Sequence, residues 1–167
     1  YVSPTPRTLS DITLNDGIKE LIQHVKLLGY KVFIVSNQPD VERGLITRQA
    51  LRDINSYLLE VLHIDGIYNC EYSADSHPDK KPNPGMLIKA ANTNFIDLKE
   101  SWMIGDSGKD IRAGKAAGCK TIYLDTDYNK NDDNFSDFVI TSLKEIYPII
   151  FNENYQENYF KIATTVT

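Results

Sequence analysis

Apolar residues along the chain switch repeatedly between helical spacing and short continuous runs. They recur every three or four positions over 18–28, which predicts an amphipathic helix ending at Gly29. The β-branched run 31–35 follows and predicts a buried strand. Thr47 is a residue type that caps helix starts well, and it begins the next helical pattern. This order of elements is typical of a chain that builds a parallel sheet.

The same alternation continues to about residue 150. Further strands are predicted at 67–70, 102–104, 121–124 and 138–140, and further helices after Pro84, at 109–117 and at 143–150. Helices that alternate with short apolar strands predict an α/β fold, a three-layer, doubly wound parallel sheet covered on both faces. The polar segment 127–136 is interpreted as a loop. Residues 1–150 are interpreted as one domain, and 151–167 as a C-terminal tail.

Composition narrows the class of partner. The net charge is −5, and no basic cluster exceeds two adjacent residues. A nucleic-acid partner is therefore not expected, and a polynucleotide phosphatase is disfavoured. No apolar run approaches the roughly 18 residues that cross a bilayer, and no signal-peptide pattern opens the chain. We expect a cytoplasmic location, no membrane partner and a small-molecule ligand, and the oligomeric state stays open.

Polar segments follow two of the predicted strands. Ser36-Asn37-Gln38 comes after the first strand, and Gly-Asp-Ser-Gly-Lys-Asp at 105–110 comes after the strand at 102–104. Ligands of a doubly wound sheet bind beyond the carboxyl ends of its strands, so these segments are candidate site residues. Between them, Lys80 and Lys81 form a basic pair on a loop that contains two prolines.

In their order, these three segments resemble motifs II, III and IV of the haloacid dehalogenase superfamily. Arg43-Gly44 and the small-residue stretch 110–118 make the chain similar to subfamily IIIA, which includes heptose bisphosphate and histidinol phosphate phosphatases. The resemblance covers about residues 1–145. It implies Mg²⁺-dependent hydrolysis of a small phosphate monoester through an aspartyl-phosphate, with a sugar phosphate such as a heptose bisphosphate as substrate. A histidinol-phosphatase-type activity is the alternative.

The resemblance also implies roles for individual residues. The Ser36 hydroxyl would hold phosphate oxygens, and Asn37 would orient the substrate. Lys81 would be catalytic, as a positive charge for the phosphate and the nucleophile. Lys80 and Arg43 are expected to contact the substrate. For each residue the plainer alternative is a turn or surface position without such a contact.

Metal binding is expected at one of two aspartates or at both. Asp106 would be a catalytic Mg²⁺ ligand, because hard cations prefer carboxylate oxygen. Asp110 would either help to position the water shell of the metal or cap the following helix. Members of this branch often hold structural zinc ahead of motif III. Here only Cys70 and His77 are ordinary zinc ligands, so zinc is not expected.

The first motif of the superfamily, Asp-x-Asp on the central strand, supplies the nucleophile and its acid–base partner. We expect no Asp-x-Asp in this chain. Either the motif lies upstream of Tyr1, or the domain is a non-catalytic binding or assembly module. Loss of a central strand would leave the facing edges of its two neighbouring strands without hydrogen-bond partners. The cost would exceed the free energy of unfolding of a domain, roughly 5–15 kcal/mol. We therefore expect the strand upstream. No large cap domain is expected, so loops 38–45 and 71–80 would set specificity.

Overall fold

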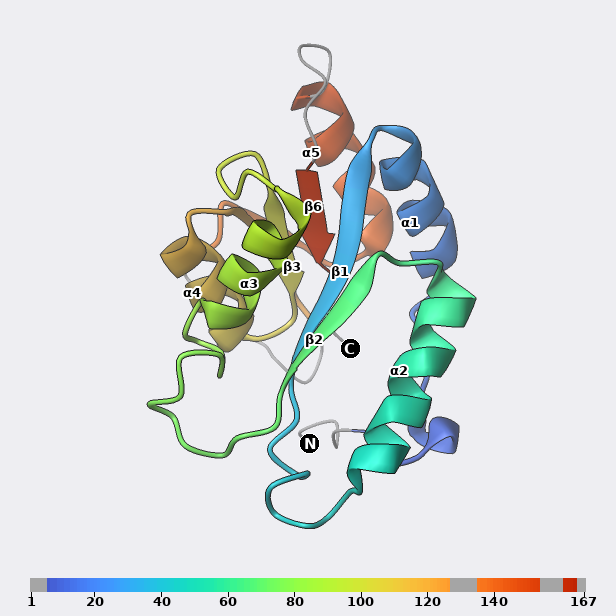
Figure 1. Ribbon diagram of the computed structural model, residues 1–167. Coiled ribbons are helices and arrows are strands. Elements are labelled where there is room, and N and C mark those ends of the chain that lie inside the picture. The colour runs from blue at the N-terminus through green and yellow to red at the C-terminus, as the bar shows by residue number, and fades with distance from the viewer. Residues whose placement is uncertain (1–5, 127–134, 154–160, 165–167) are drawn as a thin grey trace.

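A parallel sheet forms the centre of the molecule (Figure 1). The computed structural model describes residues 6–126, 135–153 and 161–164. Over these residues the strand order is β2-β1-β6-β3-β4-β5, and every neighbouring pair is parallel. The strands are β1 (Tyr30–Asn37), β2 (Gly66–Cys70), β3 (Trp102–Gly105), β4 (Lys120–Leu124), β5 (Phe138–Ile140) and β6 (Lys161–Thr164).

Helices cover both faces of this sheet. They are α1 (Ile18–Leu27), α2 (Arg48–Leu62), α3 (Gly85–Asn94), α4 (Gly108–Ala117) and α5 (Ile146–Glu153), with short 3₁₀ turns at η1 (Leu9–Asp11) and η2 (Leu143–Glu145). Helices α1, α2 and α5 lie on one face, and α3 and α4 lie on the other (Figure 1). The predicted three-layer, doubly wound sheet is confirmed.

Strand β1 shows why this architecture follows from the sequence. Val32 and Ile34 point into the core beneath α1 and α2, whereas Phe33 and Val35 point into the core beneath α3 and α4. All four side chains are buried. A strand covered on both faces has no side that contacts solvent, so its sequence is a continuous apolar run. Each such side chain contributes about 1.5–3 kcal/mol of burial.

Local signals place the helix ends close to their predicted positions. The Thr47 hydroxyl accepts a hydrogen bond of 3.0 Å from the Ala50 amide at the start of α2. Gly29, after α1, has φ +87°, a left-handed conformation that suits glycine. The predicted last helix is present as η2 and α5 together, and it runs on to Glu153.

The C-terminal part of the chain differs from the predicted tail. Lys161–Thr164 form β6, which pairs with Tyr30–Phe33 of β1 on one side and with β3 on the other. Four residues in a central strand are too few to show a period, which is why the pattern of residues 151–167 does not predict this strand. Of the predicted loop 127–136, residues 127–134 lie outside the described part of the chain.

The carboxyl ends of β1, β2 and β3 carry the loops that surround the candidate site. The stretch from Arg43 to Pro82 contains only α2, β2 and a loop, so the described residues form no large cap. None of the described helices is long and apolar enough to cross a bilayer.

Candidate active site

Ser36 lies at the carboxyl end of β1 and is 8% exposed. Its hydroxyl oxygen accepts a hydrogen bond of 3.0 Å from the side-chain amide of Gln38. The hydroxyl proton therefore remains available to donate to a ligand. The side-chain oxygen Oε1 of Gln38 is buried and has no hydrogen-bond partner among the described residues. The sequence placed Gln38 in a candidate segment without a role of its own, and its contact with Ser36 is seen only in the structure.

Lys81 is buried beside the same strand end. Its ammonium group donates to the Val35 carbonyl at 2.7 Å and pairs with an Asp110 carboxylate oxygen at 2.7 Å. The two charged side chains are 5% and 2% exposed. Removing one partner from a buried ion pair leaves an uncompensated charge, which typically costs about 3–5 kcal/mol. The pair therefore fixes a positive charge at a defined point of the site.

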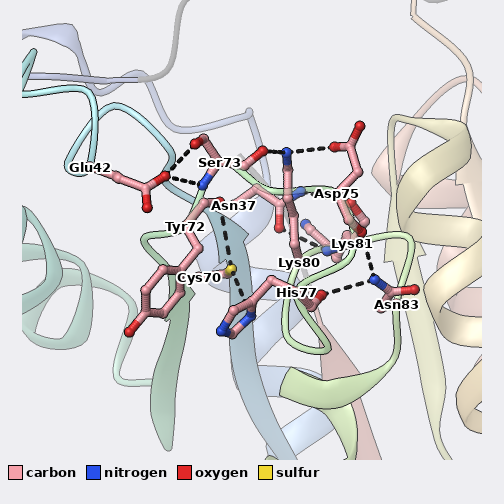
Figure 2. Close-up of polar contacts among 10 residues, drawn as sticks. All are labelled: Asn37, Glu42, Cys70, Tyr72, Ser73, Asp75, His77, Lys80, Lys81 and Asn83. Atoms are coloured by element: carbon pink, nitrogen blue, oxygen red, sulfur yellow. Dashed lines mark hydrogen bonds and ion pairs between the residues drawn. The ribbon is translucent and has the colours of Figure 1, made fainter.

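Asn37 holds the backbone of Lys81 (Figure 2). Its side-chain nitrogen donates to the Lys81 carbonyl at 3.0 Å, and its side-chain oxygen accepts from the Lys81 amide at 2.9 Å. The amide group predicted to orient the substrate is thus used to join the loop before α3 to the end of β1. These contacts support a positioning role for Asn37, through Lys81.

Asp110 uses both carboxylate oxygens within the protein. One oxygen binds Lys81, and the other accepts from the Ser107 hydroxyl at 2.9 Å and the Ser107 amide at 3.2 Å. Ser107 is the N-cap of α4, so this is a capping box. A Cβ atom on Gly105 would lie 2.3 Å from the Asp110 Cβ, and only glycine allows this approach. These contacts are those of a helix cap, and a role of Asp110 in positioning the water shell of a metal stays a prediction.

Asp106 follows β3 and is partly buried. Together with Asn15 and Gly105 it lines a cavity of about 30 Å³ whose remaining wall is mainly aliphatic. One carboxylate suits Mg²⁺, which usually keeps several waters and takes only one or two protein carboxylates. No group of three or more His, Cys, Asp or Glu side chains gathers among the described residues. That Asp106 binds Mg²⁺ stays a prediction.

The other two predicted substrate ligands differ in exposure. Lys80 is 7% exposed, and its ammonium group binds the Ser73 carbonyl and the Asp75 carboxylate, so its contacts do not support the predicted substrate role. Arg43 is half-exposed and lies 3.4 Å from the Asp40 carboxylate. The Arg7 guanidinium binds the other oxygen of Asp40 at 2.7 Å and 2.9 Å. Arg43 remains open to solvent and to a ligand.

A family model described as haloacid dehalogenase-like hydrolase matches residues 5–124. The chain belongs to this hydrolase family. A D-glycero-beta-D-manno-heptose-1,7-bisphosphate 7-phosphatase of Helicobacter pylori is 36% identical over 121 residues, 68% of this chain and 70% of that protein. A D-glycero-alpha-D-manno-heptose-1,7-bisphosphate 7-phosphatase of Campylobacter jejuni is 33% identical over 143 residues, 83% of this chain and 81% of that protein.

The fold agrees with that of solved haloacid dehalogenase-type proteins. The D,D-heptose 1,7-bisphosphate phosphatase of B. bronchiseptica, solved with magnesium and phosphate, matches with a TM-score of 0.79 and 22% identity. That match covers 88% of each chain. The family model confirms the resemblance to this superfamily.

The expectation that the chain contains no Asp-x-Asp is wrong, because Asp125-Thr126-Asp127 follows β4. This pair comes after the three motif segments in the chain, whereas the first motif is expected ahead of Ser36. Strand β4 is three positions from β1 in the sheet, which at about 4.8 Å per strand is about 14 Å. A carboxylate on Asp125 would be too far away to attack a phosphate held by Ser36. Asp127 lies outside the described residues.

The zinc loop of this hydrolase branch has no complete counterpart here. The Cys70 sulfur lies 3.8 Å from His77 Nδ1, and burial raises the pKa of the Cys70 thiol. The nearby Glu71 carboxylate is bound by Arg48 at 2.8 Å. Two donors are half of the four that structural zinc takes, so these residues do not fit the metal. That zinc is absent from the protein stays a prediction.

Proposed function

We propose that this domain is the core of a Mg²⁺-dependent phosphatase that removes one phosphate from a sugar bisphosphate of the heptose 1,7-bisphosphate class. The observation that carries the proposal is the meeting of the three motif segments at the carboxyl ends of the strands. Ser36 lies at the end of β1, Lys81 donates to the Val35 carbonyl of the same strand, and Asp106 follows β3. The relatives named above act on heptose 1,7-bisphosphates, which supports this substrate class. A cytoplasmic location goes with the proposal and stays a prediction.

The proposed roles follow from the contacts. The Ser36 hydroxyl donates to a phosphate oxygen, and the Lys81 ammonium balances phosphate charge, since phosphoryl transfer depends mainly on positioning and charge stabilisation. Asp106 would hold Mg²⁺, which supplies further neutralisation of the phosphate oxygens when bound. Arg43, half-exposed on the loop after β1, is proposed to contact the second anionic group of a bisphosphate.

The attacking carboxylate is proposed to come from an Asp-x-Asp strand ahead of Tyr1. Strand β6 pairs with residues 30–33 of β1 and with 102–103 of β3. Beyond its end, Ile34–Asn37 of β1 and Ile104–Gly105 of β3 have no strand between them among the described residues. An Asp at the end of a strand in this central position would lie between Ser36 and Asp106, on the side of the phosphate.

The test is phosphate release by the full-length protein, with and without Mg²⁺, from D-glycero-D-manno-heptose 1,7-bisphosphate and from histidinol phosphate. We expect release from the bisphosphate that needs Mg²⁺ and falls about 10³-fold in the Asp106→Asn variant, because the metal contributes several kcal/mol of charge stabilisation. Asp125→Asn is the matched control, since it makes the same change one strand further along the sheet. It should keep the activity.

Three other outcomes of the phosphate-release assay would contradict the proposal. Loss of activity in Asp125→Asn would show that the pair at 125–127 carries the reaction, contrary to the proposal. Preferred turnover of histidinol phosphate would replace the substrate class. No turnover by the full-length protein on any of a broad panel of phosphate esters would support the non-catalytic binding or assembly module.

A further inference from the structure

Lys80 is a buried lysine whose charge is neutralised entirely by its own loop (Figure 2). Its ammonium group donates to the Ser73 carbonyl and lies 2.6 Å from an Asp75 carboxylate oxygen. The Lys80 side chain is 9% exposed, whereas that of Asp75 is 93% exposed. A buried ammonium group is tolerated only when it is paired and hydrogen-bonded. Lys80 thus closes residues 73–80 into a compact turn directly before Lys81.

A second link joins this turn to the neighbouring loop. The Glu42 carboxylate accepts from the Ser73 amide at 2.6 Å and also from the Ser73 hydroxyl. These bonds from Ser73 lower the pKa of Glu42, and the bond from Lys80 lowers the pKa of Asp75. Both acids are therefore charged at neutral pH. Ser73 lies between Glu42 and Lys80 in Figure 2 and connects the loop after β1 with the loop after β2.

Two further side-chain contacts brace the turn. The Tyr72 and His77 rings are stacked with their centroids 4.2 Å apart. The Asn83 amide donates to the Asp75 carbonyl at 3.0 Å and to the His77 carbonyl at 2.9 Å. Each of these contacts joins two groups of the protein directly. The residues that would have to hold zinc at this place supply only two donors, as described above.

We propose that Lys80 is a positioning residue that joins loops 38–45 and 71–80, through Ser73 and Glu42, into one metal-independent wall beside the phosphate site. This inference rests on the proposed function, because two proposed substrate ligands adjoin the contacts of Lys80, Ser73 and Glu42. Arg43 follows Glu42, and Lys81 follows Lys80. A rigid wall holds both cations at a fixed spacing, which a substrate with two anionic groups requires.

Hydrogen exchange of the full-length protein without substrate tests the wall independently of any activity. Lys80→Met keeps the aliphatic stem and removes the charge, and Glu42→Gln weakens the link to Ser73. We expect amide exchange over 71–80 to rise by about tenfold in both variants, and over 38–45 as well in Glu42→Gln. Dialysis against EDTA should leave exchange of the unmodified protein unchanged.

Lys26→Met is the matched control. The Lys26 ammonium group also binds one carbonyl, that of His63 at 2.8 Å, and one carboxylate, that of Asp65 at 3.0 Å, but at the opposite edge of the sheet. It should not change exchange over 71–80. Unchanged exchange in Lys80→Met, or faster exchange of the unmodified protein after EDTA, would overturn the proposal. These readouts decide it even if the protein hydrolyses no phosphate ester.

Kinetics distinguish positioning from direct substrate contact. For a bisphosphate we expect Lys80→Met to raise KM about tenfold with little change in kcat, and the same for Glu42→Gln. The KM of the double variant should be no higher than that of either single variant, because both changes disrupt the same wall. If the two effects multiply, or only the lysine variant changes KM, then Lys80 contacts the substrate directly and the proposal is wrong.

Discussion

At the scale of single residues, the side chains of the site form hydrogen bonds and ion pairs with one another. Asn37 uses its side-chain amide on the Lys81 backbone, Lys81 uses its charge on Asp110, and Asp110 caps α4 through Ser107. This chain of contacts joins β1, the loop before α3 and the start of α4. The position of the Lys81 charge is therefore fixed before a ligand arrives, which is how a preorganised site stabilises developing charge.

Asn37→Ala tests how much this positioning of Lys81 contributes to kcat and to stability. The change leaves the amide and carbonyl of Lys81 without their partners, which costs about 1–3 kcal/mol for each buried group left unpaired. We expect kcat to fall about 10–100-fold, since displacement of a catalytic group by about 1 Å has effects of that size. Steady-state kinetics and thermal unfolding measure the two effects. Asn92→Ala, on the exposed face of α3, is the control and should change neither.

The sequence predicted which residues approach the site but not how they bond. Ser36, Lys81 and Asp106 are predicted as site residues because they lie near strand ends or in an ordered set of motifs, and their roles stay predictions. The contacts of Lys80 and Asn37 depend on the path of the loop 71–84, and no local pattern encodes that path. The roles of these two residues therefore became apparent only when groups seven and 44 positions apart were seen to bond.

At the scale of elements, α4 is fitted to the sheet by its small residues. A Cβ atom added at Gly114 would lie 2.5 Å from the Met103 Cβ and 2.9 Å from the Thr121 Cγ2. Helix α4 can therefore lie close against β3 and β4, which keeps its first turn, and with it Asp110, at the Lys81 ammonium group. The sequence predicted this helix well because its spacing of small residues is a local pattern.

Gly114→Ala should separate helix propensity from packing. Alanine favours a helix by about 1 kcal/mol over glycine, but overpacking of a close contact costs about 1–3 kcal/mol. Because the contacts at Gly114 are with side-chain and Cβ atoms of the sheet, we expect a net loss and a lower Tm by a few degrees. Arg112→Ala, at an exposed position of the same helix, should leave Tm within about a degree. A higher Tm for Gly114→Ala would contradict the close packing.

At the scale of the whole molecule, the notable feature is the occupant of the central strand position. We propose an Asp-x-Asp strand for this position, whereas in the structure β6 holds its amino-terminal half. Either strand could form backbone hydrogen bonds with β1 on one side and β3 on the other, because backbone pairing does not depend on side-chain identity. The sheet therefore has one place for two candidate strands, and only one of them would carry a nucleophile.

A proline in β6 distinguishes the two occupants. Ala163→Pro removes an amide from a central strand, where proline is normally excluded. We expect the 167-residue chain to lose about 1–3 kcal/mol of unfolding free energy, because a buried carbonyl of the neighbouring strand is left unpaired. Ala163→Ser keeps the amide and serves as the control. In a protein with residues ahead of Tyr1, the same proline should have little effect if an upstream strand has taken the position. Denaturant unfolding of both lengths measures the difference. Equal destabilisation in both would mean that β6 keeps the central position, and the attacking carboxylate would then have to reach Ser36 from outside the sheet.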